Sequence, residues 1–159
     1  MFTKIVQYMS EIRAIHDASK KFHWECFGPN FNGDHLLFDR VAETFNDDSI
    51  DSLAEVWYMG QARDKLSEID EFTSLVYDQR IKPTKDIASN NSFTKRLLEK
   101  IKNFKQELNT DTYGQGVKTI FDDLALKCDQ MIGLLQARVD LGRTLTEESF
   151  SKVTSTILN

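Results

Sequence analysis

Two histidines and three carboxylates at regular spacing are the residues of this chain best suited to chemistry. His35 follows His23 by twelve positions, and Asp39 comes four positions after His35. Residues four apart share one face of a helix, so His35 and Asp39 are expected to project together. Asp51 and Glu55 repeat this spacing further along the chain. Mixed imidazole and carboxylate ligands suit ferrous iron, and zinc and manganese accept the same set.

The sequence argues against one common kind of iron site. Di-iron centres inside four-helix bundles use Glu-x-x-His pairs, which place both ligands on one helical face. No Glu-x-x-His occurs here, and the chain has only three histidines. A symmetric centre within the bundle is therefore not expected. His16, the remaining histidine, lies one heptad before His23 on roughly the same helical face and is interpreted as structural.

Long amphipathic helices must position these residues. Apolar side chains recur every three or four positions through four stretches, with charged residues between them. We expect these helices to span about residues 5–26, 34–78, 93–108 and 117–142. No stretch alternates with the period of two that a strand requires. The sequence predicts a single all-α domain over residues 1–159, built as a four-helix bundle.

Capping and breaking residues set the expected ends of the helices. Gly28 and Pro29 end the first helix, because glycine supplies a left-handed cap and proline cannot continue the ladder. Asp34 is expected to cap the second helix. The polar cluster at residues 46–49 predicts a bulge or break, since its side chains compete for backbone hydrogen bonds. Beyond Gly142, a capping box predicts a separate short C-terminal helix.

Composition limits the classes of function. The formal charge is -5 with only two cysteines, and no apolar run approaches the ~20 residues of a membrane span. The start of the chain becomes polar too early for a secretory signal, so we expect a soluble cytoplasmic protein. Cys26 and Cys128 are expected to be reduced thiols in the core. The acidic balance disfavours DNA binding, which depends on neutralising phosphates.

The segment from Phe22 to Asp39 resembles the signature of the Dps (DNA-protection-during-starvation) branch of the ferritin-like superfamily. In that family a His-Trp pair ends the first helix, and a Gly-Pro-x-Phe turn leads to a helix with His-x-x-x-Asp. His23-Trp24, Gly28-Pro29-x-Phe31 and His35-x-x-x-Asp39 match this order. The resemblance covers two helices well and the four-helix layout loosely.

The resemblance implies a ferroxidase that stores iron. His23, His35 and Asp39 of one subunit would face Asp51 and Glu55 of its two-fold mate, with Trp24 packed beside the iron. These five side chains would be both the metal ligands and the catalytic residues. Ferrous iron would be oxidised, preferably by hydrogen peroxide, and kept as ferric mineral inside a twelve-subunit shell. Such a protein limits oxidative damage.

Two departures from the family pattern leave alternatives open. The interval from His35 to Asp51 is one residue longer than usual, and an extra helical residue rotates all later side chains by ~100° unless a π-bulge absorbs it. We expect such a bulge at residues 46–49; without it, Asp47 or Asp48 would substitute. The alternative is a ferritin-like scaffold with a degenerate metal site, serving as an interaction module. No lysine-rich tail is present, so weak or no DNA binding is expected.

Overall fold

The protein is helical throughout the part of the chain that the structure describes. This computed structural model describes residues 4–82, 89–108 and 113–158, with side chains up to residue 142. The predicted all-α class is confirmed. The elements in chain order are α1 (Ile5–Glu25), α2 (Phe31–Thr44), α3 (Asp47–Leu53), the π-helix η1 (Ala54–Met59), the 3₁₀-helix η2 (Arg63–Glu71), α4 (Phe72–Gln79), α5 (Asn90–Glu107) and α6 (Gln115–Leu158).

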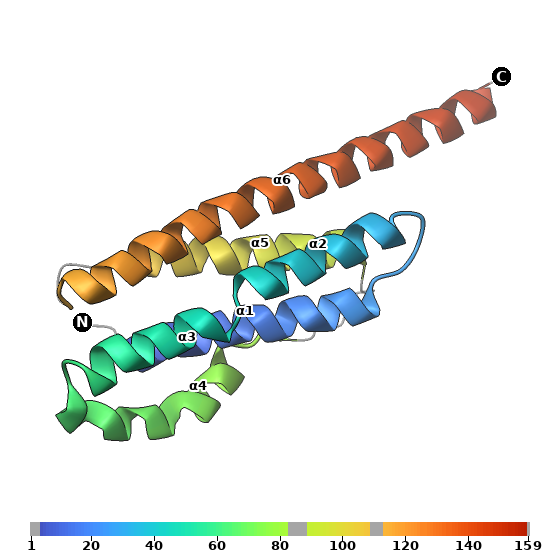
Figure 1. Cartoon of the computed structure of the whole chain (residues 1–159). Helices are drawn as coiled ribbons and strands as arrows, with labels where there is room; N and C mark the ends of the chain where they lie inside the picture. The colour runs from blue at the N-terminus through green and yellow to red at the C-terminus, as the bar shows by residue number, and fades with distance from the viewer. Residues whose placement is uncertain (1–3, 83–88, 109–112, 159) are drawn as a thin grey trace.

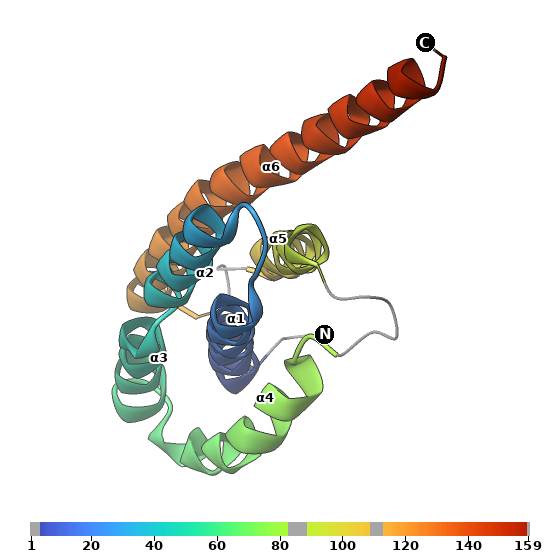
Figure 2. The ribbon, with the colours of Figure 1, turned by 90° about the vertical axis from the view of Figure 1, so that its right-hand side faces the viewer.

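The helices are arranged around α1. This helix contacts α2, α3, α4 and α5, while α6 packs mainly against α5 (Figures 1 and 2). The chain turns back after α1, so that α2 and then α3 run alongside it, and α4 covers a further side of α1. None of the described helices is both long and apolar enough to cross a membrane.

Aromatic side chains form the centre of the core. The ring of Tyr8 packs edge-on against Phe121, with 4.8 Å between centroids, and also against Phe104. Its hydroxyl donates to the Glu107 carbonyl oxygen at 2.8 Å, so burial leaves no polar atom of the ring unpaired. The fully buried hydroxyl of Tyr58 accepts from the Val6 backbone N–H at 3.0 Å. These contacts join α1 to α5, α6 and η1.

The second predicted helix is broken, as expected, but it also ends early. Asn46 separates α2 from α3, and its side chain accepts a hydrogen bond from the Asp48 backbone N–H. This confirms the predicted break in the polar cluster. The helix does not continue to residue 78, because η1 ends at Met59 and the chain turns away at Gly60. A Cβ at Gly60 would lie 2.8 Å from the Val56 carbonyl oxygen, so this turn has room only for glycine. A 3₁₀-helix and α4 then complete this part of the chain.

The predicted separate C-terminal helix is wrong. The last helix, α6, runs without interruption to Leu158 and extends beyond the other helices (Figure 1). Gly142 has no positive φ, and a single glycine inside a helix costs only ~1 kcal/mol. No proline comes after it to stop the ladder. The side chains of the predicted capping box at residues 144–147 lie outside the described residues, as does Pro83.

Two glycines near the turn between α1 and α2 have opposite roles, which mutation should reveal. Gly28 has φ +88°, whereas Gly33 lies inside α2 with open space around its Cα. Gly28→Ala should lower the free energy of unfolding by about 1–2 kcal/mol, because side chains disfavour the left-handed region. Gly33→Ala should raise it by roughly 0.5–1 kcal/mol. Urea unfolding measures both changes, and shifts of the same sign would contradict this assignment.

Candidate metal centre

His23 and His35 form a stacked pair at the junction of two helices. His23 lies in the last turn of α1, and His35 lies near the start of α2. Their ring centroids are 3.6 Å apart, and the planes differ by 21°. Both side chains are half-buried. The turn around Gly28 therefore brings together the two histidines that the sequence singled out.

Reciprocal hydrogen bonds orient both rings. The Nδ1 of His23 donates to the His35 carbonyl oxygen at 2.8 Å, and the Nδ1 of His35 donates to the His23 carbonyl oxygen at 2.9 Å. A carbonyl can only accept, so the proton of each neutral ring sits on Nδ1. Each Nε2 then carries a free lone pair. Backbone carbonyls commonly orient metal-binding histidines in this manner.

Asp39 adds a carboxylate close to the histidine pair. The Lys20 ammonium, 2.7 Å from an Asp39 carboxylate oxygen, holds the pKa of Asp39 below its ordinary value, and His23 and His35 act in the same direction. Asp39 is therefore ionised at neutral pH. His23, His35 and Asp39 lie close enough to interact electrostatically. Lys20, which the sequence did not single out, neutralises the carboxylate.

Cys26 lies beside the histidines, with its Sγ close to His35. Its Sγ is 3.3 Å from the His23 carbonyl oxygen, to which it donates, and 3.7 Å from His35 Nδ1. Burial raises the pKa of Cys26, with the charge of Asp34 acting in the same direction. The group is therefore a thiol at neutral pH. Cys26 and Cys128 are both buried and free, which confirms the prediction made for them.

Asp51 and Glu55 are exposed on another part of the surface. Asp51 belongs to α3, and Glu55 lies in η1. The π-helical turns occur at residues 54–59 and not at the polar cluster, where the sequence suggested a bulge. Asp47 contacts Arg13 in an ion pair. Among the described residues, no group of three or more histidine, cysteine or acidic side chains is placed to hold a metal ion.

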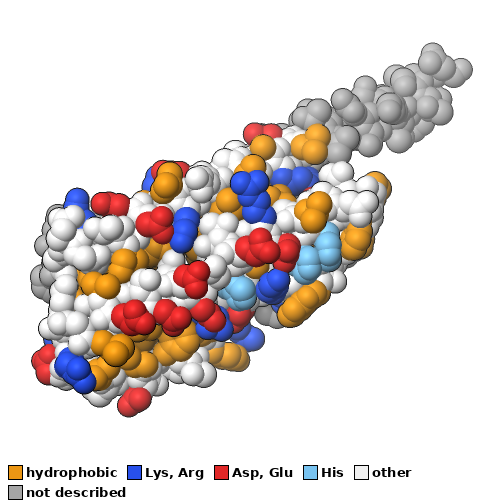
Figure 3. All heavy atoms as spheres, in the orientation of Figure 1, with side chains coloured by type: hydrophobic (Ala, Val, Ile, Leu, Met, Phe, Trp, Pro, Cys, Tyr) orange, Lys and Arg blue, Asp and Glu red, His pale blue; other side chains and the backbone are white. Residues whose placement is uncertain are grey.

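Exposed apolar side chains surround the histidine pair. Trp24 is 74% exposed and Leu36 is 68% exposed. Phe27 and Phe31 are also exposed, and the Phe31 ring stacks on His35 at 5.0 Å. Figure 3 shows hydrophobic and acidic side chains beside the histidines on one face of the molecule. Large apolar side chains gathered in this way typically mark an interaction surface.

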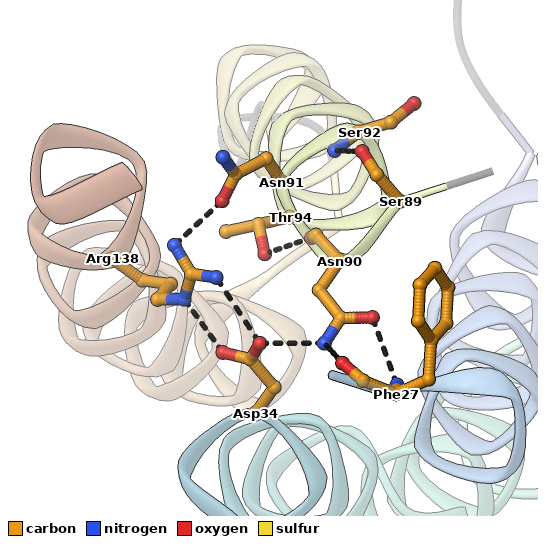
Figure 4. Close-up of polar contacts among 8 residues, drawn as sticks. All are labelled: Phe27, Asp34, Ser89, Asn90, Asn91, Ser92, Thr94 and Arg138. Carbon is orange, nitrogen blue, oxygen red and sulfur yellow. Dashed lines mark hydrogen bonds and ion pairs between the residues drawn. The ribbon is translucent and has the colours of Figure 1, made fainter. Parts of the chain in front are cut away.

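A buried ion pair beneath the turn was not foreseen. Asp34 is 1% exposed and receives two hydrogen bonds from Arg138, at 2.6 and 3.1 Å (Figure 4). The interpretation of Asp34 as an N-cap is wrong, because α2 begins three residues earlier, at Phe31. The early start lets the Asp34 side chain face α6. The charged Arg138, which lies between the apolar residues Leu135 and Val139, was the feature of the sequence that indicated a buried ion pair.

Asn90 links this ion pair to the turn that holds the histidines. Its amide nitrogen donates to an Asp34 carboxylate oxygen at 2.8 Å and to the Phe27 carbonyl oxygen at 2.6 Å. Its oxygen accepts from the Phe27 backbone N–H at 3.2 Å, as Figure 4 shows. Both backbone groups of Phe27 are thus held from α5. The segment between His23 and His35 is anchored to the bundle at this point.

Comparison with known proteins leaves the family open. No protein-family model matches the sequence. No curated protein matches it. No solved structure matches the fold.

Proposed function

We propose that this chain is a ferritin-like protein that binds and oxidises ferrous iron at a centre shared between two copies. The observation that supports it is the stacked pair of His23 and His35, whose hydrogen bonds leave both Nε2 atoms available. Asp39 supplies a nearby carboxylate. Zinc and manganese would compete for the same ligands. Iron is the substrate of the proposed reaction.

A second copy would complete the centre. Within one copy, the described residues include no group of three side chains placed to hold a metal ion, and exposed Asp51 and Glu55 of another copy would supply further carboxylates. The exposed side chains of Trp24 and Leu36 beside the histidines suit burial between copies. Such dimers would build a closed shell, of twelve subunits by resemblance. Dividing the ligands between copies would make oxidation depend on assembly.

The proposed reaction balances with peroxide as the oxidant. Two ferrous ions each lose one electron, the O–O bond of hydrogen peroxide breaks, and two protons are taken up to give two water molecules. The two electrons leave together, so no hydroxyl radical is released. Asp39, Asp51 and Glu55 would stabilise the ferric product, because carboxylates prefer hard cations. The product would be kept as mineral within the shell, which limits oxidative damage in the cytoplasm.

A scaffold without metal chemistry is the second candidate. The ion pair between Lys20 and Asp39 supports it, because the ammonium occupies the carboxylate that a metal ion would need. In that case the helical surfaces would serve protein interaction. DNA binding is not part of either proposal, because the chain carries a net charge of -5.

Aerobic titration with ferrous iron separates these candidates. The purified protein, with its oligomer size measured, should oxidise iron rapidly and saturably in the presence of peroxide. His35→Ala should abolish saturable oxidation, because it removes one Nε2 and the stack. The readouts are ferric absorbance and iron retained per chain.

His16→Ala is the matched control. His16 is also half-buried, and its Nδ1 contacts the Ala42 carbonyl oxygen at 2.9 Å, yet it lies outside the stacked pair. This variant should oxidise iron like the wild type, and circular dichroism should show the same helix content for all three proteins. Oxidation by the wild type no faster than in buffer would reject the ferroxidase and favour the scaffold.

A further inference from the structure

A basic pocket lies between the end of α4 and α5, away from the histidines. Its volume is about 510 Å³, and it is lined by residues 78–82 on one side and by side chains of α5 on the other. Among the described residues, two carboxylates contribute to the lining, Asp78 and Glu99. The five cations that line it are Arg80, Lys82, Lys95, Arg96 and Lys100. The pocket thus has three positive charges in excess, on a chain whose net charge is -5.

Four of these five cations form no ion pair with any residue that the structure describes. Elsewhere the described lysines and arginines are often paired, and eight of them form ion pairs. Within the ranges that the structure describes, Arg80, Lys82, Lys95 and Arg96 form none. Like charges gathered at one place repel one another, so the arrangement costs free energy unless an anion binds there. A multivalent anion would supply the opposite charge.

Neighbouring groups hold both arginines in place. The Arg80 guanidinium lies 4.0 Å from the centroid of the Tyr77 ring and donates to its hydroxyl at 3.0 Å. Arg96 lies over the Phe22 ring and donates to the Lys82 carbonyl oxygen. Neither contact neutralises a charge. Guanidinium groups that are already oriented suit phosphate, whose oxygens accept paired hydrogen bonds.

Lys100 forms the partly buried side of the pocket. Its Nζ donates to the Gln79 side-chain oxygen at 3.0 Å. Burial lowers the pKa of Lys100, while the nearby Glu107 opposes that shift. An anion in the pocket would favour the charged form of this ammonium. The Lys100 ammonium thus contributes to the pocket from its partly buried side.

A largely apolar pocket, whose lining also includes Asp17, Lys21 and Thr73, adjoins the basic one. It lies between α1 and α4, has a volume of about 400 Å³, and shares Arg80 and Ile81 with the basic pocket. Ala14, Ala18 and Val76 contribute apolar walls, and Tyr77 contributes an aromatic ring. Both volumes lie within the usual range of ~300–1,000 Å³ for small-molecule sites. One ligand with a flat apolar part and a charged part would fill both.

We propose that this pair of pockets binds a nucleoside di- or triphosphate, with the phosphates among the α4–α5 cations and the base in the α1–α4 pocket. The Tyr77 ring, one face of which is covered by the Arg80 guanidinium, contributes an aromatic wall for the base. The observations favour a small ligand over a nucleic acid. A polynucleotide needs a long basic track, whereas these cations are confined to one pocket of an acidic chain.

Calorimetric titration with ATP, without divalent metal, tests the assignment. We expect one ATP per chain, and weaker binding of inorganic triphosphate, which cannot use the apolar pocket. Lys95→Gln and Arg96→Gln should each weaken ATP binding about tenfold, because each removes one charge-assisted contact. Lys95 is exposed, so its removal leaves folding intact even if Arg96→Gln does not.

Arg63→Gln is the matched control for the loss of one positive charge. Arg63 is exposed in η2 and lines neither pocket, so the affinity of this variant for ATP should equal that of the wild type. Absence of ATP binding, or equal affinity of Lys95→Gln and the wild type, would overturn the proposal. Equal affinities for ATP and triphosphate would overturn the role of the apolar pocket. Binding of single-stranded DNA without binding of ATP would overturn the nucleotide proposal and indicate a nucleic-acid surface instead.

Discussion

Asp34→Ala should lower the free energy of unfolding by about 3–5 kcal/mol, because it leaves the Arg138 guanidinium inside the protein without its counter-ion. Asp34 is 1% exposed and the Arg138 side chain 12% exposed, so water cannot replace the lost partner. The substitution also removes an acceptor from Asn90, which holds the Phe27 backbone. Urea unfolding at pH 7 measures the loss.

An exposed ion pair supplies the control for this substitution. Asp129 pairs with Lys105 at 2.5 Å, and both side chains are exposed. Asp129→Ala removes the same charge from the surface and should cost less than about 1 kcal/mol. Replacing both buried partners, as in Asp34→Leu with Arg138→Met, should cost less than Asp34→Ala alone. Similar losses for Asp34→Ala and Asp129→Ala would contradict the importance of the buried pair.

Glu11→Gln should remove a large part of the pH dependence of stability. Glu11 is 4% exposed on α1, and burial together with the hydrogen bond that its protonated carboxyl donates to Glu107 raises its pKa to about 8. In the unfolded chain the group titrates near 4.5. Between these values the folded state holds a proton that the unfolded state has released. The contribution of Glu11 to stability is therefore fully present below pH 4.5 and is lost as pH rises to about 8.

Denaturant unfolding between pH 5 and 9 measures this effect. The wild type should lose up to about 1.4 kcal/mol per pH unit relative to Glu11→Gln, because one proton is released on unfolding. The glutamine keeps a donor for Glu107 but cannot ionise. Glu43→Gln is the control, since Glu43 is exposed on α2. Parallel stability curves for Glu11→Gln and the wild type would show that Glu11 is ionised in the folded protein.

The sequence by itself determined the helical class and the positions of most helices. Apolar spacing is a local property, and helical hydrogen bonds join residues four apart, so α1, α5 and the start of α6 agree with expectation. The polar cluster around Asn46 also predicted its break, because an asparagine side chain caps the backbone beside it. The pairing of His23 with His35 followed from the Gly28 turn between them.

Only the tertiary structure decided which charges meet. Arg138 lies 104 positions from Asp34, and no local rule links them; the packing of α6 beside α2 does. The same holds for Lys20, which reaches Asp39, and for the α4–α5 cations, which come together because the chain folds back after η1. These contacts depend on helix packing, because the relative positions of the helices decide which long side chains come within reach of one another. The candidate ligands are local in sequence, whereas their neighbours and their burial are properties of the whole fold.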